Sequence, residues 1–263
     1  MDEAALRESA ADLLLAMREQ SLLPDLPLQT QLTSPFKGHL PDDLMEVLWA
    51  LREDGCELCW SVRRCMMMAY ERKAPERTLG LHEDTRACGG RLDRSACNAV
   101  LCALAQGARA GDALRLFKEM CSEDKTSPSS MMTPNGKTYG SVIRACTAGG
   151  KDQVAVALFD CMVTKGVAPN RFAYHDAILS CMRLKQMSRA LSLYAKMKKD
   201  RVPPCDNTLR LLIRTCAMRG WHEEAASISE DFRSAKSAEA VAALAESEDT
   251  TDYRESSVDG ESE

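Results

Sequence analysis

Several features that would assign this 263-residue sequence to a common class are missing from it. No apolar run approaches the roughly 18 residues that a membrane-spanning helix needs. Secretory signals begin with positive charge and organelle transit peptides avoid acids, yet the start carries Asp2, Glu3, Glu8 and Asp12. The sequence therefore predicts no membrane contact and shows no targeting segment of either kind.

The common catalytic motifs are also missing. There is no glycine-rich phosphate loop, no G-x-S-x-G and no H-E-x-x-H. His222, Glu223 and Glu224 match the H-x-E that begins zinc deaminase sites, but no cysteine follows Cys216 to complete such a metal shell. We therefore predict no enzyme, no catalytic residue, no cofactor, no bound metal and no small-molecule substrate.

Cysteine, in contrast, is abundant, with twelve residues. A C-x-x-C and three further possible ligands lie within one stretch: Cys56, Cys59, Cys65, His82 and Cys88. A structural zinc site needs four such ligands in a loop geometry. The run 56–68 has a helical pattern, however, so we interpret these cysteines as reduced core thiols, with zinc as the alternative.

The charged residues divide the chain into three blocks. Residues 94–222 hold 20 Lys and Arg against 9 Asp and Glu, a net charge of +11. The preceding 93 residues carry −6, and the residues from 223 onward carry −10. A basic block between acidic flanks favours an anionic partner, with nucleic acid first, although a solvated polar surface is the alternative.

A fixed period runs through the basic block. Pro134, Pro169 and Pro204 are spaced by 35 residues, and Cys146, Cys181, Cys216 and other residues repeat at the same interval. A period of this length is typical of stacked supersecondary units, which favour an extended binding surface over a catalytic pocket. The repeated position of these cysteines gives them a structural explanation, as small apolar residues at helix contacts.

Each repeat reads as a helical hairpin. In the second unit, Tyr139, Val142, Ile143 and Cys146 form one apolar stripe at spacings of three and four. The second helices share the pattern Ala-x-x-Leu-(Phe/Tyr)-x-x-Met. The predicted fold is therefore an all-α solenoid of four units, at residues 94–135, 136–170, 171–205 and 206–232. The first unit is seven residues longer, which we interpret as an insertion in the loop before Pro134.

The flanks are less regular. We predict a helical N-terminal flank over residues 1–93, in which 44–52 and 56–68 form a helical pair that resembles a degenerate capping unit, while 73–93 form a loop. Residues 233–263 are expected to form a short helix and a disordered acidic tail, because they contain little apolar surface to bury.

Helical hairpins of 35 residues that close on Pro-Asn, as at Pro134–Asn135 and Pro169–Asn170, resemble pentatricopeptide repeats. The related tetratricopeptide repeat, a protein-binding solenoid, has a different pattern and a period of 34 residues. The resemblance implies single-stranded RNA as the partner and a role in RNA processing, stability or translation in a mitochondrion or chloroplast. It also implies that the fifth and last residues of a unit contact one base.

Carried onto this chain, the resemblance pairs Asn98 with Asn135, Gly140 with Asn170, and His175 with Cys205, and leaves Arg210 alone in the last unit. The first pair resembles a pyrimidine reader. At the second position of each unit the family stacks an apolar residue on a base, and only Phe172 suits that task here. The predicted RNA-binding residues are therefore Asn98, Asn135, Asn170, Phe172, His175 and Arg210.

Two further hypotheses accompany this prediction. Arg144, Lys151, Arg183 and Lys185 are candidates for contacts with the RNA backbone. Because only one of the pairs can be read as a base-recognition pair, the alternative function is a protein–protein interaction scaffold, with partners in an RNA-processing or ribosomal complex.

Overall fold

The computed structural model describes residues 3–34, 40–126 and 132–234, which contain helices and turns and no strand. The predicted short C-terminal helix and acidic tail lie almost entirely outside the described residues. The helices are α1 (Glu3–Glu19), α2 (Leu26–Thr33), α3 (Asp42–Glu53), α4 (Trp60–Lys73), α5 (Pro75–Ala87), α6 (Arg94–Gln106), α7 (Ala110–Thr126), α8 (Gly136–Ala148), α9 (Asp152–Thr164), α10 (Arg171–Arg183), α11 (Met187–Lys199), α12 (Asp206–Met218) and a last helix at 222–234.

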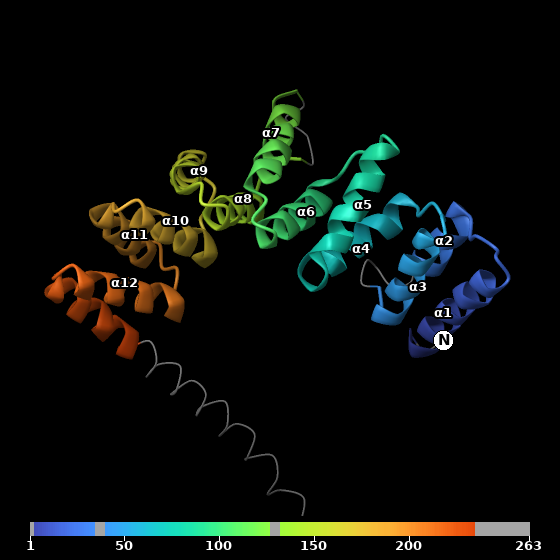
Figure 1. Ribbon diagram of the computed structural model, residues 1–263, viewed down its shortest axis with the longest axis horizontal. Coiled ribbons are helices and arrows are strands. Elements are labelled where there is room, and N and C mark those ends of the chain that lie inside the picture. Colours follow the sequence, from blue (N-terminus) through green and yellow to red (C-terminus); the bar gives the residue numbers. More distant parts are fainter. Residues whose placement is uncertain (1–2, 35–39, 127–131, 235–263) are drawn as a thin grey trace, which may run out of the picture.

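The helices stack as antiparallel hairpins into an arch (Figure 1). The first helices of successive hairpins, α4, α6, α8, α10 and α12, pack on one another along the inner edge of the arch. The second helices α5, α7 and α9 lie on its outer side. The predicted all-α solenoid of stacked helical hairpins is therefore confirmed.

Each first helix begins immediately after the residue that closes the preceding unit. Asp93, Asn135 and Asn170 cap α6, α8 and α10, and each side chain accepts a hydrogen bond from a backbone N–H of the first turn. Such caps satisfy amides that have no partner within the helix. Cys205 occupies the same place before α12 and makes no side-chain cap bond.

The turns inside the last three hairpins each use one residue in the left-handed region. These residues are Gly150, Lys185 and Gly220, with φ of 70°, 60° and 76°, at intervals of 35 residues. Glycine adopts this conformation without steric cost, whereas a lysine does not. The period therefore fixes backbone conformation as well as side-chain type.

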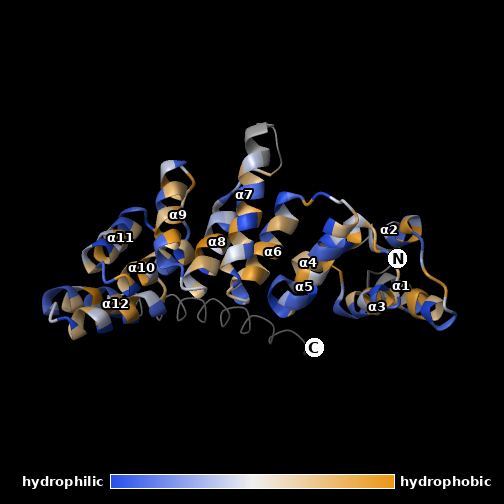
Figure 2. Ribbon diagram, turned by 45° about the horizontal axis from the view of Figure 1, so that its top comes forward, coloured by the Kyte–Doolittle hydropathy of each residue, from blue (hydrophilic) through white to orange (hydrophobic). Residues whose placement is uncertain are grey.

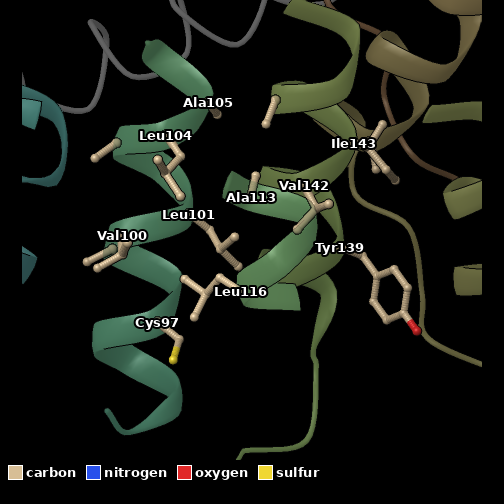
Figure 3. Packing of buried hydrophobic residues seen from close by; sticks show 14 of the residues in the cluster. Cys97, Val100, Leu101, Leu104, Ala105, Ala113, Leu116, Tyr139, Val142 and Ile143 are labelled. Atoms are coloured by element: carbon tan, nitrogen blue, oxygen red, sulfur yellow. The ribbon is translucent and has the colours of Figure 1, made fainter. Parts of the chain in front are cut away.

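The core lies between and within the hairpins. Figure 3 shows the packing between α6, α7 and α8, where Leu101 and Leu116 approach each other. Cys146, Cys181 and Cys216 are completely buried, as their repeated position predicts. Between units, an aromatic ring of a second helix packs against a tyrosine of the next first helix: Phe117 lies 5.1 Å from Tyr139, and Phe159 lies 5.0 Å from Tyr174, between ring centroids.

The prediction of a loop over 73–93 is wrong. Residues Pro75–Ala87 form α5, which pairs with α4 as a hairpin and packs on α6, so the array begins one unit earlier, at Trp60. The predicted helix at 56–68 likewise begins only at Trp60 and extends to Lys73. The sequence did not predict helix α5 because the buried face of this helix includes Thr78 and Thr85 in addition to leucines. The face therefore has no continuous apolar stripe.

The N-terminal helices cover the first end of the array. Helix α1 packs on α3, and α2 packs on α4. Gln29 of α2 is fully buried, and its side chain donates to the carbonyl of Glu57 and accepts from the N–H of Cys59. These bonds fix the segment that leads into α4.

Helix α7 runs on to Thr126, so part of the seven-residue insertion extends a helix on the outer side of the arch and does not form a loop (Figure 1). Figure 2 shows hydrophobic and hydrophilic residues interspersed along the helices of the array. Within the described residues, no helix has the length and apolar character that a bilayer crossing requires.

Candidate nucleic-acid interface

The predicted RNA-binding residues all lie on the first helices or at their N-caps, along the inner edge of the arch. Asn98 lies on α6, Phe172 and His175 lie on α10, and Arg210 lies on α12. The residue that closes each unit precedes the next first helix. Each fifth residue therefore faces a junction between two stacked helices.

At the junction of α6 and α8, the structure brings Asn98 and Asn135 together around Thr138. The Thr138 Oγ1 lies 2.7 Å from Asn98 Oδ1 and 3.0 Å from Asn135 Oδ1, and it accepts a bond from the Asn135 N–H at 3.1 Å. Thr138 is fully buried and Asn98 is 5% exposed. The predicted pyrimidine-reading pair is thus hydrogen-bonded inside the protein.

The junction of α8 and α10 is different, because Gly140 and Ala173 stand where the previous junction has Asn98 and Thr138. The Oδ1 of Asn170 accepts from the N–H groups of Phe172 and Ala173, at 3.1 and 2.9 Å. A Cβ added to Gly140 would lie 3.7 Å from the Asn170 Nδ2. The exposed Asn170 amide therefore borders a position that no side chain fills.

The junction of α10 and α12 repeats the first arrangement with different residues. Thr208 Oγ1 lies 2.8 Å from His175 Nδ1 and 3.1 Å from Cys205 Sγ, and it is fully buried. Cys205 and His175 themselves approach to 4.0 Å. A threonine hydroxyl again joins the fifth residue of one unit to the residue that closes it.

A fourth junction, between α4 and α6, belongs to the unit that sequence reasoning missed. Its fifth residue is Arg64, and its closing residue is Asp93. The Arg64 guanidinium lies 3.6 Å from the Asp93 carboxylate, and the two side chains are about one third exposed. This pair lies in register with the other three because α4 stacks on α6 as α6 stacks on α8.

Phe172 lies in the first turn of α10, and 41% of the surface of this residue is exposed to solvent. The guanidinium of Arg144, from α8, lies 5.1 Å from its ring centroid, and that of Arg171 lies 4.9 Å away. Arg144 also contacts the buried carboxylate of Asp176 at 3.4 Å. Burial raises the pKa of Asp176, against the opposing effect of Arg144. The result is an exposed aromatic ring bordered by two cations.

Arg210 lies beside an open groove between α10 and α12. The groove has a volume of about 370 Å3 and is lined by His175, Leu179, Asn207, Arg210, Leu211 and Arg214. The Arg210 guanidinium also lies 5.7 Å from the ring of Phe232 on the last helix. The groove joins positive charge to apolar surface on the two stacked first helices.

Much of the remaining basic charge is paired within the protein. Arg183 donates to the carbonyl of Thr147 at 2.6 Å and lies 3.5 Å from the Asp152 carboxylate. Lys137, at the second position of its unit, contacts Glu71 at 2.9 Å. Because Glu71 lies outside residues 94–222, its pairing with Lys137 lowers the positive charge available to a ligand below the net value of +11. Lys151 and Lys185 are exposed, at the turns inside their hairpins.

The C-x-x-C lies before α4 and not within it, so the predicted helical placement of Cys56 and Cys59 is wrong. Both are buried, and Cys59 is the N-cap residue. All twelve cysteines are free thiols. Across the described ranges, no three His, Cys, Asp or Glu side chains are grouped in a way that could hold a metal ion.

The two threonines are functional candidates that sequence reasoning did not consider. Thr138 and Thr208 occupy the third position of their units and are separated by two periods of 35 residues. That repetition was visible in the sequence. Their contacts were not, because each hydroxyl meets a residue on the previous first helix.

Comparison with known proteins bears on this interface. Residues 72–246, about two thirds of the chain, match the family model described as the pentacotripeptide-repeat region of PRORP. No curated protein matches the sequence. The structure resembles the pentatricopeptide-repeat domain of Arabidopsis thaliana protein-only RNase P 1 in complex with tRNA, with a TM-score of 0.53 and 19% identity over 64% of this chain and 86% of that domain.

Two further solved structures have the same fold. PPR10 in complex with an 18-nucleotide psaJ RNA element has a TM-score of 0.54 and 17% identity, over 82% of this chain and 31% of PPR10. Nuclear proteinaceous RNase P 2 from A. thaliana has a TM-score of 0.54 and 16% identity, over 65% of this chain and 37% of that protein. This chain thus spans only about a third of these two proteins. From the family match and the stacked hairpins we conclude that the chain belongs to the pentatricopeptide-repeat family.

Proposed function

We propose that this protein binds single-stranded RNA along the inner edge of its arch and acts in organelle RNA processing, stability or translation. The observation that carries the proposal is the exposed ring of Phe172, bordered by Arg144 and Arg171 on adjacent first helices. An aromatic face accepts any base by stacking, and the guanidinium groups attract phosphates. Two of the similar structures contain RNA, which supports the same class of ligand.

Base stacking and phosphate contacts are expected to contribute to RNA affinity in different ways. Stacking of a base on an aromatic side chain contributes about 1–3 kcal/mol, which corresponds to roughly fivefold to 150-fold in affinity. Each phosphate contact on a single strand contributes about 0.7 to the slope of log affinity against log salt. Binding through Phe172 and the two arginines is therefore expected to weaken steeply as salt increases.

The test is fluorescence anisotropy with labelled single-stranded RNA over a series of salt concentrations. Phe172→Ala is expected to lose roughly fivefold or more in affinity, whereas Phe172→Tyr, which keeps the ring, retains it. Arg171→Gln is expected to lower the salt slope by about 0.7. Arg115→Gln, on the outer helix α7 with its side chain 75% exposed, is the matched control and leaves the slope unchanged. Salt-independent binding that survives Phe172→Ala would overturn the proposal.

A second candidate function, a protein–protein interaction scaffold, is favoured by the hydrogen bonds that occupy Asn98 and His175 inside the protein. Affinity purification before and after nuclease treatment separates the two functions. Partners that persist after the RNA is digested support the scaffold, and partners that dissociate support RNA binding.

A further inference from the structure

The four junctions between stacked first helices fall into two groups. At three of them, the fifth residue already has a polar partner inside the protein: Arg64 with Asp93, Asn98 with Thr138, and His175 with Thr208. At the remaining junction the fifth residue is Gly140, which has no side chain, and the third residue of the next unit is Ala173, which has no hydroxyl. Both threonines thus hold a polar fifth residue, whereas Arg64 is paired with Asp93 and the third residue of the unit after it is Ala96, which has no hydroxyl.

The contact at Asn98 is strong on geometric grounds. The distance of 2.7 Å is typical of a good hydroxyl hydrogen bond, and both groups are almost completely buried. A base that took Asn98 away from Thr138 would leave a buried hydroxyl with one partner fewer. Loss of a buried partner costs roughly as much free energy as a base contact supplies, equivalent to about fivefold to 150-fold in affinity.

The contact at His175 is equivalent to the one at Asn98, because it also joins a fifth residue to a buried threonine hydroxyl. The His175 Nδ1 lies 2.8 Å from the fully buried Thr208 Oγ1, which also holds the Cys205 thiol. The ring nitrogen nearest the junction is therefore engaged before any ligand arrives. His175 still lines the groove beside α12, where it offers its ring surface for stacking.

We infer that Thr138 and Thr208 determine specificity by holding the fifth residues of two units inside the protein, so that the array binds RNA with little discrimination between bases at these junctions. This inference rests on the proposed RNA binding. It assigns a role to two third-position residues and leaves the junction at Gly140 and Asn170 as the open one among the described residues. A hydroxyl, and not the amide or imidazole itself, then decides whether a junction reads a base.

The test compares affinities for labelled poly(U), poly(C) and poly(A) by fluorescence anisotropy. Thr138→Val keeps the shape of the side chain and removes the hydroxyl, so Asn98 is released. We expect the ratio of pyrimidine to purine affinity to change by roughly threefold to tenfold, the effect of one hydrogen bond. Thr138→Ser keeps the hydroxyl and is expected to retain the wild-type ratio.

Thr147→Val is the matched control. Thr147 is also a buried threonine on α8, and its hydroxyl lies 3.0 Å from Ser180 Oγ between α8 and α10, but it contacts neither a fifth nor a closing residue. Its removal is expected to leave the affinity ratio unchanged. Thr208→Val is the second test variant, in case loss of the capping interaction at Thr138 prevents folding.

Three outcomes decide the matter. A changed ratio in Thr138→Val or Thr208→Val, with Thr138→Ser and Thr147→Val unchanged, supports the inference. An unchanged ratio in both folded valine variants overturns it. If the wild type binds no RNA, the proposed function fails, and urea unfolding of Asn98→Ala, Thr138→Val and the double variant still tests the contact. Strictly additive shifts of the midpoint would show that the two residues do not hold each other.

Discussion

Replacement of Phe159 by alanine is expected to uncouple the two ends of the arch. Phe159 on α9 is 1% exposed, and its ring packs 5.0 Å from that of Tyr174 on α10, in the next unit. Removal of a buried phenylalanine costs about 3–5 kcal/mol. In stacked repeats the stability is roughly the sum of unit and interface terms, so this loss falls on one interface. It is a large fraction of the roughly 5–15 kcal/mol that stabilises a typical domain.

The tryptophans provide the assay. Trp49 and Trp60 lie on α3 and α4, and Trp221 lies at the other end, before the last helix. Urea unfolding is followed by tryptophan fluorescence in two backgrounds. Trp221→Phe leaves Trp49 and Trp60 as the reporters, and the double variant Trp49→Phe with Trp60→Phe leaves Trp221. Each background is measured with and without Phe159→Ala. We expect coincident midpoints with Phe159 present. With alanine, the midpoint reported by Trp221 should fall below the one reported by Trp49 and Trp60.

Phe117→Ala is the matched control, since Phe117 makes the same kind of ring contact one unit earlier but is only partly buried. It is expected to cost less than Phe159→Ala because less of its surface leaves water on folding. Coincident transitions in Phe159→Ala, together with a loss of less than about 1 kcal/mol in the free energy of unfolding measured by linear extrapolation, would contradict this expectation.

Three further predictions concern local features of the fold: a turn residue, a buried carboxylate and a buried thiol. Lys185→Gly should stabilise the protein by up to about 1 kcal/mol in urea unfolding, because Lys185 has a φ of 60°, whereas Gly150→Ala at the equivalent turn should destabilise it. Burial raises the pKa of Asp176, so its charged form costs stability at neutral pH and this cost vanishes as the pH falls through that pKa. Asp176→Asn should therefore exceed the wild type in melting temperature at about pH 7, with a difference that shrinks under acidic conditions. Burial raises the pKa of Cys146 to about 11, so iodoacetamide should alkylate the exposed Cys88 first and spare Cys146 until unfolding, as mass spectrometry of the peptides would show.

The sequence predicted the repeat fold because its period is carried by residues that the stack buries. Cys146 and its equivalents, and the alanines of the second helices, are apolar at every recurrence, so their phase could be read directly. Helix α5 could not be read in this way. It buries Thr78 and Thr85 through hydrogen bonds to the carbonyls of Met67 and Leu81, and no simple hydrophobic pattern reports such a face.

The site could be predicted only as a set of positions. The resemblance to pentatricopeptide repeats, in the phase that the period fixes, paired Asn98 with Asn135 and Gly140 with Asn170, and the structure brings each pair to a junction of stacked helices. Whether those groups are available depends on contacts such as that of Thr138 with Asn98, which are separated by 40 residues in the chain. Such contacts depend on how one helix lies on another, and local spacing contains no information about that.

The insertion in the first unit has a practical consequence. It lengthens α7 to 17 residues, against 13 for α9, on the outer side of the arch. Asn98 and Thr138 nevertheless meet as His175 and Thr208 do, although the latter are only 33 residues apart. The spatial register of the inner edge is thus independent of length added outside it. The far end of α7 is therefore the natural place for a fluorophore or an affinity tag, since a label there leaves every inner junction intact.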